Sequence, residues 1–231
     1  MALPTARAWD RRAWAAGIIF VLALLAEAVI SAGIPINQND SAAKIARALQ
    51  DDRRTVLAAA YLSAVYAVAF VIYLAKLHDC LCGVTKRPGV LHSLVLIGGV
   101  LMVALHAVSD VGSYGLLGGK LASYHNEGIS YTLYLLTFAL DSVGDVFGSV
   151  FLVAAGVLVM QSHVLPRWLA WVAVASGTLL FLQAFGLGGV IGTYGLVLDL
   201  IGFVLFLLFV FLSSAISIRN PGPARASEAS T

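Results

Sequence analysis

Long apolar stretches alternate with short polar segments along the whole chain. An α-helix rises about 1.5 Å per residue, so about 20 apolar residues cross a hydrocarbon core about 30 Å thick. Six stretches reach that length: Trp14 to Gly33, Thr55 to Ala75, Val90 to Ser109, Ile129 to Met160, Trp168 to Leu187 and Tyr194 to Ile218. The pattern predicts an all-α fold, a polytopic transmembrane helical bundle of six spans.

The fourth stretch, Ile129 to Met160, is too long for a single crossing. Its residues would extend roughly 48 Å as a helix, against a core of about 30 Å. We therefore expect its first part to project beyond the membrane, before Asp141.

The segment after the first span has a helical pattern of its own, "NDSAAKIARALQDDRR". Asp40 or Ser41 can cap a helix in which Ala42, Ile45, Ala46 and Leu49 share one face. This predicts a short amphipathic helix on the outer surface.

Lysine and arginine are enriched in cytoplasmic segments of membrane proteins, so they predict the orientation. With the N-terminus inside, nine of the 14 basic residues are cytoplasmic: Arg7, Arg11, Arg12, Lys76, Lys86, Arg87, Arg167, Arg219 and Arg225. The outer segments hold Lys44, Arg47, Arg53, Arg54 and Lys120. We expect both termini in the cytoplasm, with 1–13 as an N-terminal segment, 14–218 as the transmembrane domain and 219–231 as a disordered tail.

Composition agrees with a membrane protein and excludes several other classes. Hydrophobic residues make up 60% of the chain and charged residues 11%, whereas soluble domains are about 45 to 50% apolar. The net charge is +2 and the basic residues form no patch, so a nucleic-acid partner is not expected. Membrane lipid is the partner that the composition predicts. The two cysteines, Cys80 and Cys82, lie too close in sequence for a disulfide framework.

Several polar side chains interrupt the apolar spans, all near the same membrane face. Counted from the inner ends of the spans, they lie within one or two turns of the outer boundary. They are Glu27, His106, Asp110, Asp141, Asp145, Gln183 and Asp199. Ionisable groups inside a span are costly and tend to face the bundle or a wet cavity. This predicts an acidic pocket, open to the outside, as the ligand-binding site.

The spacing of these residues favours a shared charge. Asp141 and Asp145 are four positions apart, as are His106 and Asp110, so each pair shares a helix face. Grouped carboxylates without a basic neighbour need a proton or a cation between them. A transporter or sensor that binds a cation, a proton or a small basic molecule is the leading hypothesis.

Two other classes remain open. An intramembrane enzyme acting on a lipid or isoprenoid could use Glu27, Asp141, Asp145 or Asp199 as general acid or base, with His106 on a divalent metal. Alternatively, a scaffold would use the same groups only for packing. An enzyme is the less favoured, and the sequence assigns no cofactor, metal or catalytic residue. Inverted repeats would place equivalent acids on opposite leaflets, which weighs against a transporter built that way.

The stretch "DSVGDVFGSVFLVAAGVLVMQSHVLPRWLAWVAVASG", residues 141–177, resembles a known family. Its features are a long helix with an early acid and a Leu-Pro-Arg-Trp-Leu turn into the next helix. The run "VLAAAYLSAVYAVAFVIYLAKL" is also similar. The family consists of uncharacterised bacterial multi-pass membrane proteins, known only as a domain of unknown function. The resemblance implies six helices in a bacterial plasma membrane and supplies no site residues.

Overall fold

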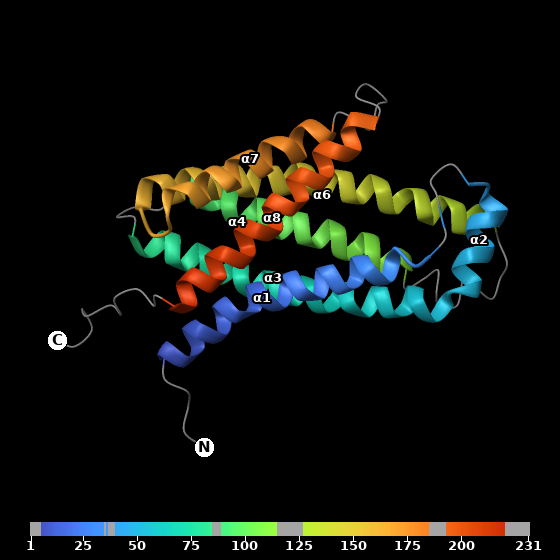
Figure 1. Ribbon diagram of the computed structural model, residues 1–231, viewed down its shortest axis with the longest axis horizontal. Helices are drawn as coiled ribbons and strands as arrows, with labels where there is room; N and C mark the ends of the chain where they lie inside the picture. The colour runs from blue at the N-terminus through green and yellow to red at the C-terminus, as the bar shows by residue number, and fades with distance from the viewer. Residues whose placement is uncertain are drawn as a thin grey trace, which may run out of the picture.

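The computed structural model describes residues 6–34, 36, 40–84, 89–114, 127–184 and 193–219. In these ranges the regular secondary structure is helical (Figure 1). They are α1 (Ala6–Ser31), α2 (Ala42–Asp51), α3 (Arg53–Val84), α4 (Val90–Ala107), the π-helix η1 (Val108–Tyr114), α6 (Glu127–Ser162), α7 (Arg167–Ala184) and α8 (Thr193–Arg219). The all-α prediction is confirmed.

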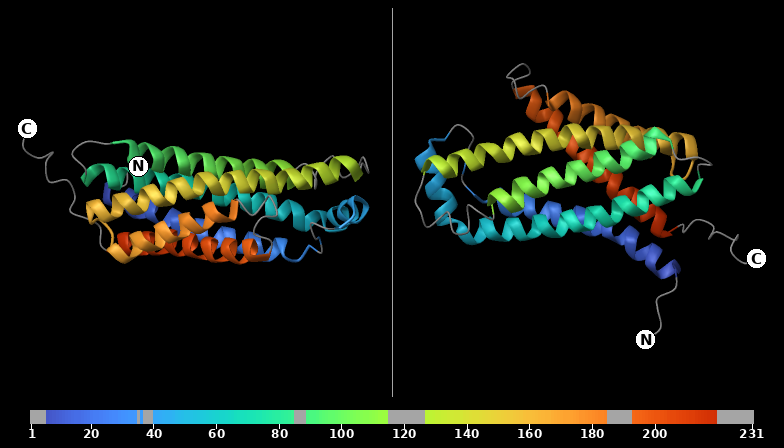
Figure 2. Two further views of the ribbon diagram at one scale, coloured as in Figure 1. Left: turned by 90° about the horizontal axis from the view of Figure 1, so that it is seen from above. Right: turned by 180° about the vertical axis from the view of Figure 1, so that it is seen from behind.

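The six long helices form a closed ring in chain order. Each packs on the next, from α1 through α3, α4, α6 and α7 to α8, and α8 packs back on α1. Figures 1 and 2 show that α1 begins and α8 ends at one end of the bundle, here called the terminal end. The short helix α2 lies across the other end, here called the α2 end. An up-and-down ring of this kind brings side chains from six helices to one axis.

Aromatic side chains fill the ring on its terminal side. Phe20, Phe70, Phe151 and Phe206 come from four different helices and are almost completely buried. Phe70 lies 4.9 Å from Phe20, 5.8 Å from Phe151 and 6.0 Å from Phe206, measured between ring centroids. These four residues, here called the phenylalanine plug, meet across the ring. Polar side chains are buried elsewhere in it as well, since the Tyr73 and Ser213 hydroxyls lie 2.8 Å apart.

Five helical segments are long and apolar enough to cross a membrane: Asp10–Ser31, Arg53–Val84, Val90–Val111, Glu127–Ser162 and Val197–Arg219. The chain is therefore a multi-pass integral membrane protein. The fifth predicted span corresponds to α7, which as described has 18 residues and is not among the five. The tail after Arg219 lies outside the described residues.

Two helices are longer than predicted at the terminal end. The helix α1 begins at Ala6, and α3 continues to Val84 through the polar sequence that follows Ala75. An ion pair explains part of this, because Lys76 Nζ lies 2.6 Å from the Asp10 carboxylate and 3.5 Å from that of Asp79. Pairing at the ends of two adjacent helices lets both continue past the apolar region.

The predicted amphipathic helix is confirmed as α2. Ser41 is its N-cap and accepts a hydrogen bond from the Lys44 backbone N–H at 3.3 Å. Ile45, Ala46 and Leu49 are buried, as their shared face predicts. Ile45 and Leu49 form a small core with Val56 and Tyr134, separate from the main core of the ring. The first turns of α6 thus pack beside α2.

Candidate functional site

Every long helix of the ring carries a polar side chain in the α2 half. The structure places Glu27 on α1, His106 on α4, Asp110 on η1, Asp141 and Asp145 on α6, Gln183 on α7 and Asp199 on α8. Tyr66, on α3, joins them through its bond to Asp110. We use the name acidic cluster for Glu27, His106, Asp110, Asp141, Asp145 and Asp199.

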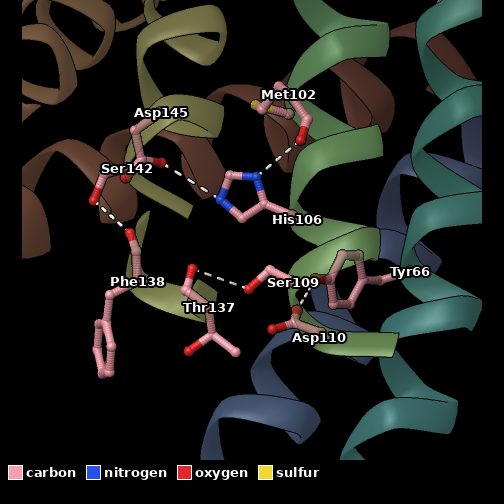
Figure 3. Close-up of polar contacts among 9 residues, drawn as sticks. All are labelled: Tyr66, Met102, His106, Ser109, Asp110, Thr137, Phe138, Ser142 and Asp145. Atoms are coloured by element: carbon pink, nitrogen blue, oxygen red, sulfur yellow. Dashed lines mark hydrogen bonds and ion pairs between the residues drawn. The ribbon is translucent and has the colours of Figure 1, made fainter. Parts of the chain in front are cut away.

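His106 joins α4 to α6 at the centre of the cluster (Figure 3). Its Nδ1 lies 2.9 Å from the backbone carbonyl of Met102, and its Nε2 lies 3.5 Å from Oδ1 of Asp145. A carbonyl oxygen can only accept, so Nδ1 must carry the hydrogen. Nε2 therefore faces the Asp145 carboxylate, and the two groups form an ion pair when the imidazole carries a second proton.

A glycine provides the space for the His106 ring. A Cβ at Gly144 would lie 2.5 Å from both Cε1 and Nδ1 of His106. One turn further along α6, a Cβ at Gly148 would lie 2.8 Å from the sulfur of Met102. The two small residues let α4 approach α6 closely.

Asp110 bonds in a different direction from His106. The Tyr66 hydroxyl on α3 donates to the Asp110 carboxylate, whereas His106 faces α6 (Figure 3). The cause is the π-helix that begins at Val108, because its wider turn shifts each following side chain around the axis. The neighbouring Ser109 hydroxyl donates to the Thr137 carbonyl at 3.2 Å and so fixes η1 to α6. His106 and Asp110 therefore have different direct partners, although the charge of His106 still reaches Asp110.

The other carboxylates lie within range of one another's charge. Asp141 is affected by the charges of Asp110, His106 and Asp145, and its Oδ1 is buried without a hydrogen-bond partner among the described residues. Asp199 is affected by Asp145 and His106. Glu27 accepts a hydrogen bond from the Ser31 hydroxyl and is affected by Asp110. The acidic cluster is thus a single electrostatic group across the ring.

Lysine and arginine are absent from this group. In the described part of the chain, the basic residues nearest to the α2 end are Lys44 and Arg47 on α2 and Arg53 and Arg54 at the start of α3. The charges that act on Glu27, Asp110, Asp141 and Asp199 come from other members of the cluster. His106 is the only group in the acidic cluster that can carry a positive charge.

Some expected features are not found in the described residues. No three His, Cys, Asp or Glu side chains among them converge as metal ligands. Gln183 is half-buried near the end of α7. Among the described residues its amide oxygen has no hydrogen-bond partner, so no such bond from this atom joins it to the acidic cluster. Two surface hollows, of about 390 and 320 Å³, lie on α2 and between α4, α6 and α7, and neither is lined by a cluster residue.

Sequence reasoning missed three contributors to this site. Tyr66 fixes Asp110, the Met102 carbonyl fixes the His106 tautomer, and Gly144 makes room for the ring. A signal for Tyr66 exists, since a phenol in the middle of an apolar span needs a polar partner. The contact with Met102 has no sequence signal, because it is a backbone group.

A comparison with known families identifies the family of this chain. The family model described as Domain of unknown function (DUF4386) matches residues 17–213, most of the chain and nearly the whole ring. The chain belongs to the DUF4386 family. No curated protein and no solved structure matches it. DUF4386 thus establishes membership of an uncharacterised family, and the site must be interpreted from its own geometry.

Proposed function

We propose that this protein binds a proton or a small basic molecule in the α2 half of its ring, as a transporter or sensor does. The observation that supports this is the acidic cluster: five carboxylates and one histidine from four ring helices and η1, within range of one another's charge. Such a group in a partly dry site cannot be fully ionised without a counter-charge. The described part of the ring offers only His106, so the remaining charge is balanced by bound protons or a bound cation.

The cluster suits a diffuse cation better than a metal ion. Its carboxylates are spread over several helices and two of them are already engaged, Asp145 with His106 and Asp110 with Tyr66. A divalent metal needs several ligands at coordination distance, which the described residues do not provide. A quaternary ammonium ion, in contrast, attracts carboxylates by its charge over a few ångströms and needs no fixed coordination geometry.

The orientation is part of the proposal. We place both termini in the cytoplasm of a bacterial cell, in its plasma membrane, because nine of the 14 basic residues then lie inside. The helix α7 is the sixth span in this arrangement. It packs between α6 and α8, and its 18 residues extend about 27 Å, close to the thickness of a hydrocarbon core. The acidic cluster then faces the outside, above the phenylalanine plug.

Thermal unfolding of the purified protein in a neutral detergent tests this function. A ligand that binds only the folded state raises the unfolding midpoint with its concentration. We expect tetramethylammonium chloride to raise the midpoint above that seen with sodium chloride at equal ionic strength, and the effect to vanish in Asp141→Asn.

The matched control is Asp79→Asn, because Asp79 is exposed at the terminal end and has the same charge. This variant should keep the response to tetramethylammonium. Identical unfolding midpoints in the two salts across the pH range would exclude an organic cation as the ligand. If the difference in midpoint between the parent and Asp141→Asn did not change with pH, a proton would be excluded. Both results together would favour the scaffold, in which these groups serve only packing.

A further inference from the structure

An apolar groove lies on the outer surface of the ring, along α6. It has a volume of about 320 Å³ and is lined by side chains of α4, α6 and α7. Figures 1 and 2 show α6 between α4 and α7, so α6 forms the base of the groove and its two neighbours form the sides. We call this hollow the α6 groove. It is separate from the acidic cluster, because no cluster residue lines it.

The chemistry of the groove selects an apolar occupant. Two lining residues carry hydroxyls, and both already donate to their own helices. Ser149 donates to the Val146 carbonyl at 2.7 Å, and Thr178 to the Val174 carbonyl at 2.8 Å. All other lining residues are apolar. A trapped water needs at least about two polar partners, so the groove offers little to water or to a polar ligand.

The groove lies in the half of the membrane at the terminal end. The helix α7 begins there with Arg167, and Phe181 on the side of the groove is about 21 Å further along the helix. A head-group layer of about 6 Å and half of a hydrocarbon core add up to the same length. Arg167 at the level of the head groups therefore places Phe181 near the midplane. On the other side, Leu91 belongs to the first turn of α4, at the same end of the bundle.

One face of α7 connects the groove to the membrane surface. Arg167, Trp171, Thr178 and Phe181 are spaced by four, seven and three residues, which places them along one side of a helix. Thr178 and Phe181 line the groove, whereas Trp171 is 63% exposed and Arg167 is also exposed. In the described part of the chain, no carboxylate forms an ion pair with Arg167. Tryptophan is enriched at the membrane interface, and basic side chains there attract anionic head groups.

We infer that the α6 groove binds one acyl chain of an anionic phospholipid from the leaflet at the terminal end, with the lipid phosphate beside Arg167. The charge of Arg167 complements the head group, and the groove reaches from the membrane surface to the midplane as an acyl chain does. An apolar hollow left empty would lose its dispersion contacts, which a lipid chain restores. The inference rests on α7 crossing the membrane, as proposed above. It makes no use of the acidic cluster, so its failure would leave the cation site standing.

Photolabelling of the unmodified protein tests the site. The probe is a phosphatidylglycerol with a diazirine in the middle of one acyl chain, at low mole fraction in phosphatidylcholine nanodiscs. We expect it to label 177–181 in preference to Val204 and Leu208, which are exposed on α8. Unlabelled phosphatidylglycerol should reduce the groove label saturably, and additional phosphatidylcholine should not. Equal labelling of the two helices, or equal competition by the two lipids, would overturn the inference.

Filling the groove should displace the lipid chain. In Thr178→Trp we expect the competable label on 149–154 to disappear. The matched control is Leu208→Trp, because Leu208 lies eleven residues before Arg219 as Thr178 lies eleven after Arg167, and both positions are exposed. This control should keep the label, as should the shape-conserving Thr178→Val. Retention of the competable label in Thr178→Trp, or its loss in both tryptophan variants, would overturn the inference.

The head group is tested by charge. Arg167→Gln should raise the concentration of phosphatidylglycerol needed for half-maximal competition about fivefold, as the loss of one basic residue at a membrane surface implies. Arg219→Gln, at the same end of the bundle, should leave it unchanged. An unchanged value in Arg167→Gln would overturn the inference.

A second copy of this chain is the competing occupant. In a protein whose Cys80 and Cys82 are replaced by serine, Thr178→Cys should form no disulfide between copies in the membrane. Efficient cross-linking there would overturn the inference, since a second copy would then cover the groove.

Discussion

Gly144 and the His106 ring occupy adjoining positions between α4 and α6. A Cβ at Gly144 would lie 2.5 Å from two ring atoms, which is too close for the ring to stay in place. The contact of His106 with Asp145 therefore depends on the absence of a side chain at position 144.

Gly144→Ala should consequently separate packing from charge. We expect a loss of about 1 to 3 kcal/mol in unfolding free energy, typical of overpacking, together with loss of the stabilisation by tetramethylammonium. Gly156→Ala is the matched control, because its Cβ would meet Val174 and Ala170 on α7, away from the cluster. That variant should be destabilised and still respond to the cation. Loss of the response in both variants would contradict a specific role for the His106 position.

Asp141 and Asp145 should respond to neutralisation with opposite signs. Asp145→Asn removes the carboxylate that faces Nε2 of His106, so we expect a destabilisation of about 1 to 3 kcal/mol. Asp141→Asn removes a charge whose Oδ1 has no partner in the described structure, so it should stabilise the protein. The measurement is the unfolding midpoint of each variant without added cation. A shift of both midpoints in the same direction relative to the parent would contradict this geometry.

The residues of the site show what their sequence could and could not predict. Asp141, Asp145 and Asp199 were identifiable because a carboxylate in an apolar span is conspicuous. Their partners were not, since the Met102 carbonyl is a backbone group and the role of Gly144 depends on how closely two helices approach. The different direct partners of His106 and Asp110 were also not predictable, because regular α-helical spacing does not hold through a π-helix.

At the scale of single elements, α2 is held by a core of its own. Ile45 and Leu49 pack with Val56 and Tyr134, and these four are separate from the aromatic interior of the ring. The element was predictable because its apolar residues follow a helical period next to a capping serine. The length of α3 was not, because the Asp10–Lys76 ion pair that supports its polar end joins segments far apart in sequence.

Ile45→Ala should loosen α2 without unfolding the ring. The lost burial and residual cavity typically cost about 2 to 5 kcal/mol. We expect this to exceed the free energy by which so small a core holds α2 in place. Hydrogen exchange followed by mass spectrometry should show faster exchange in 42–51 and in the first turns of α6, with little change in α4 or α7. Arg47→Ala, on the exposed face of the same helix, should leave the exchange pattern as it is. Uniformly faster exchange throughout the Ile45→Ala protein would show that the two cores are not independent.

At the scale of the whole molecule, the ring has one end that carries α2 and another where α1 begins and α8 ends (Figure 1). An even number of crossings follows from this arrangement if every long helix spans the membrane. The orientation rests on the distribution of basic residues, which the sequence alone supplies.

Cysteine accessibility should report that orientation. In a protein whose Cys80 and Cys82 are replaced by serine, Arg47→Cys on α2 should react with a membrane-impermeant maleimide in intact cells. Asp79→Cys and His163→Cys, both exposed at the terminal end, should react only after permeabilisation. The reverse pattern would turn the acidic cluster toward the cytoplasm and place its ligand inside the cell.

The contact between α1 and α8 has a consequence for how the protein is made. It joins the first and the last helix, so Phe20 and Gly17 have no partner on that side until nearly the whole chain has left the ribosome. During insertion, Glu27 therefore sits in a helix whose second neighbour has not yet been synthesised. Ring closure must be a late step of assembly, and a chain that stops before Thr193 should be retained by the insertion machinery or degraded rather than persist as a stable five-helix bundle.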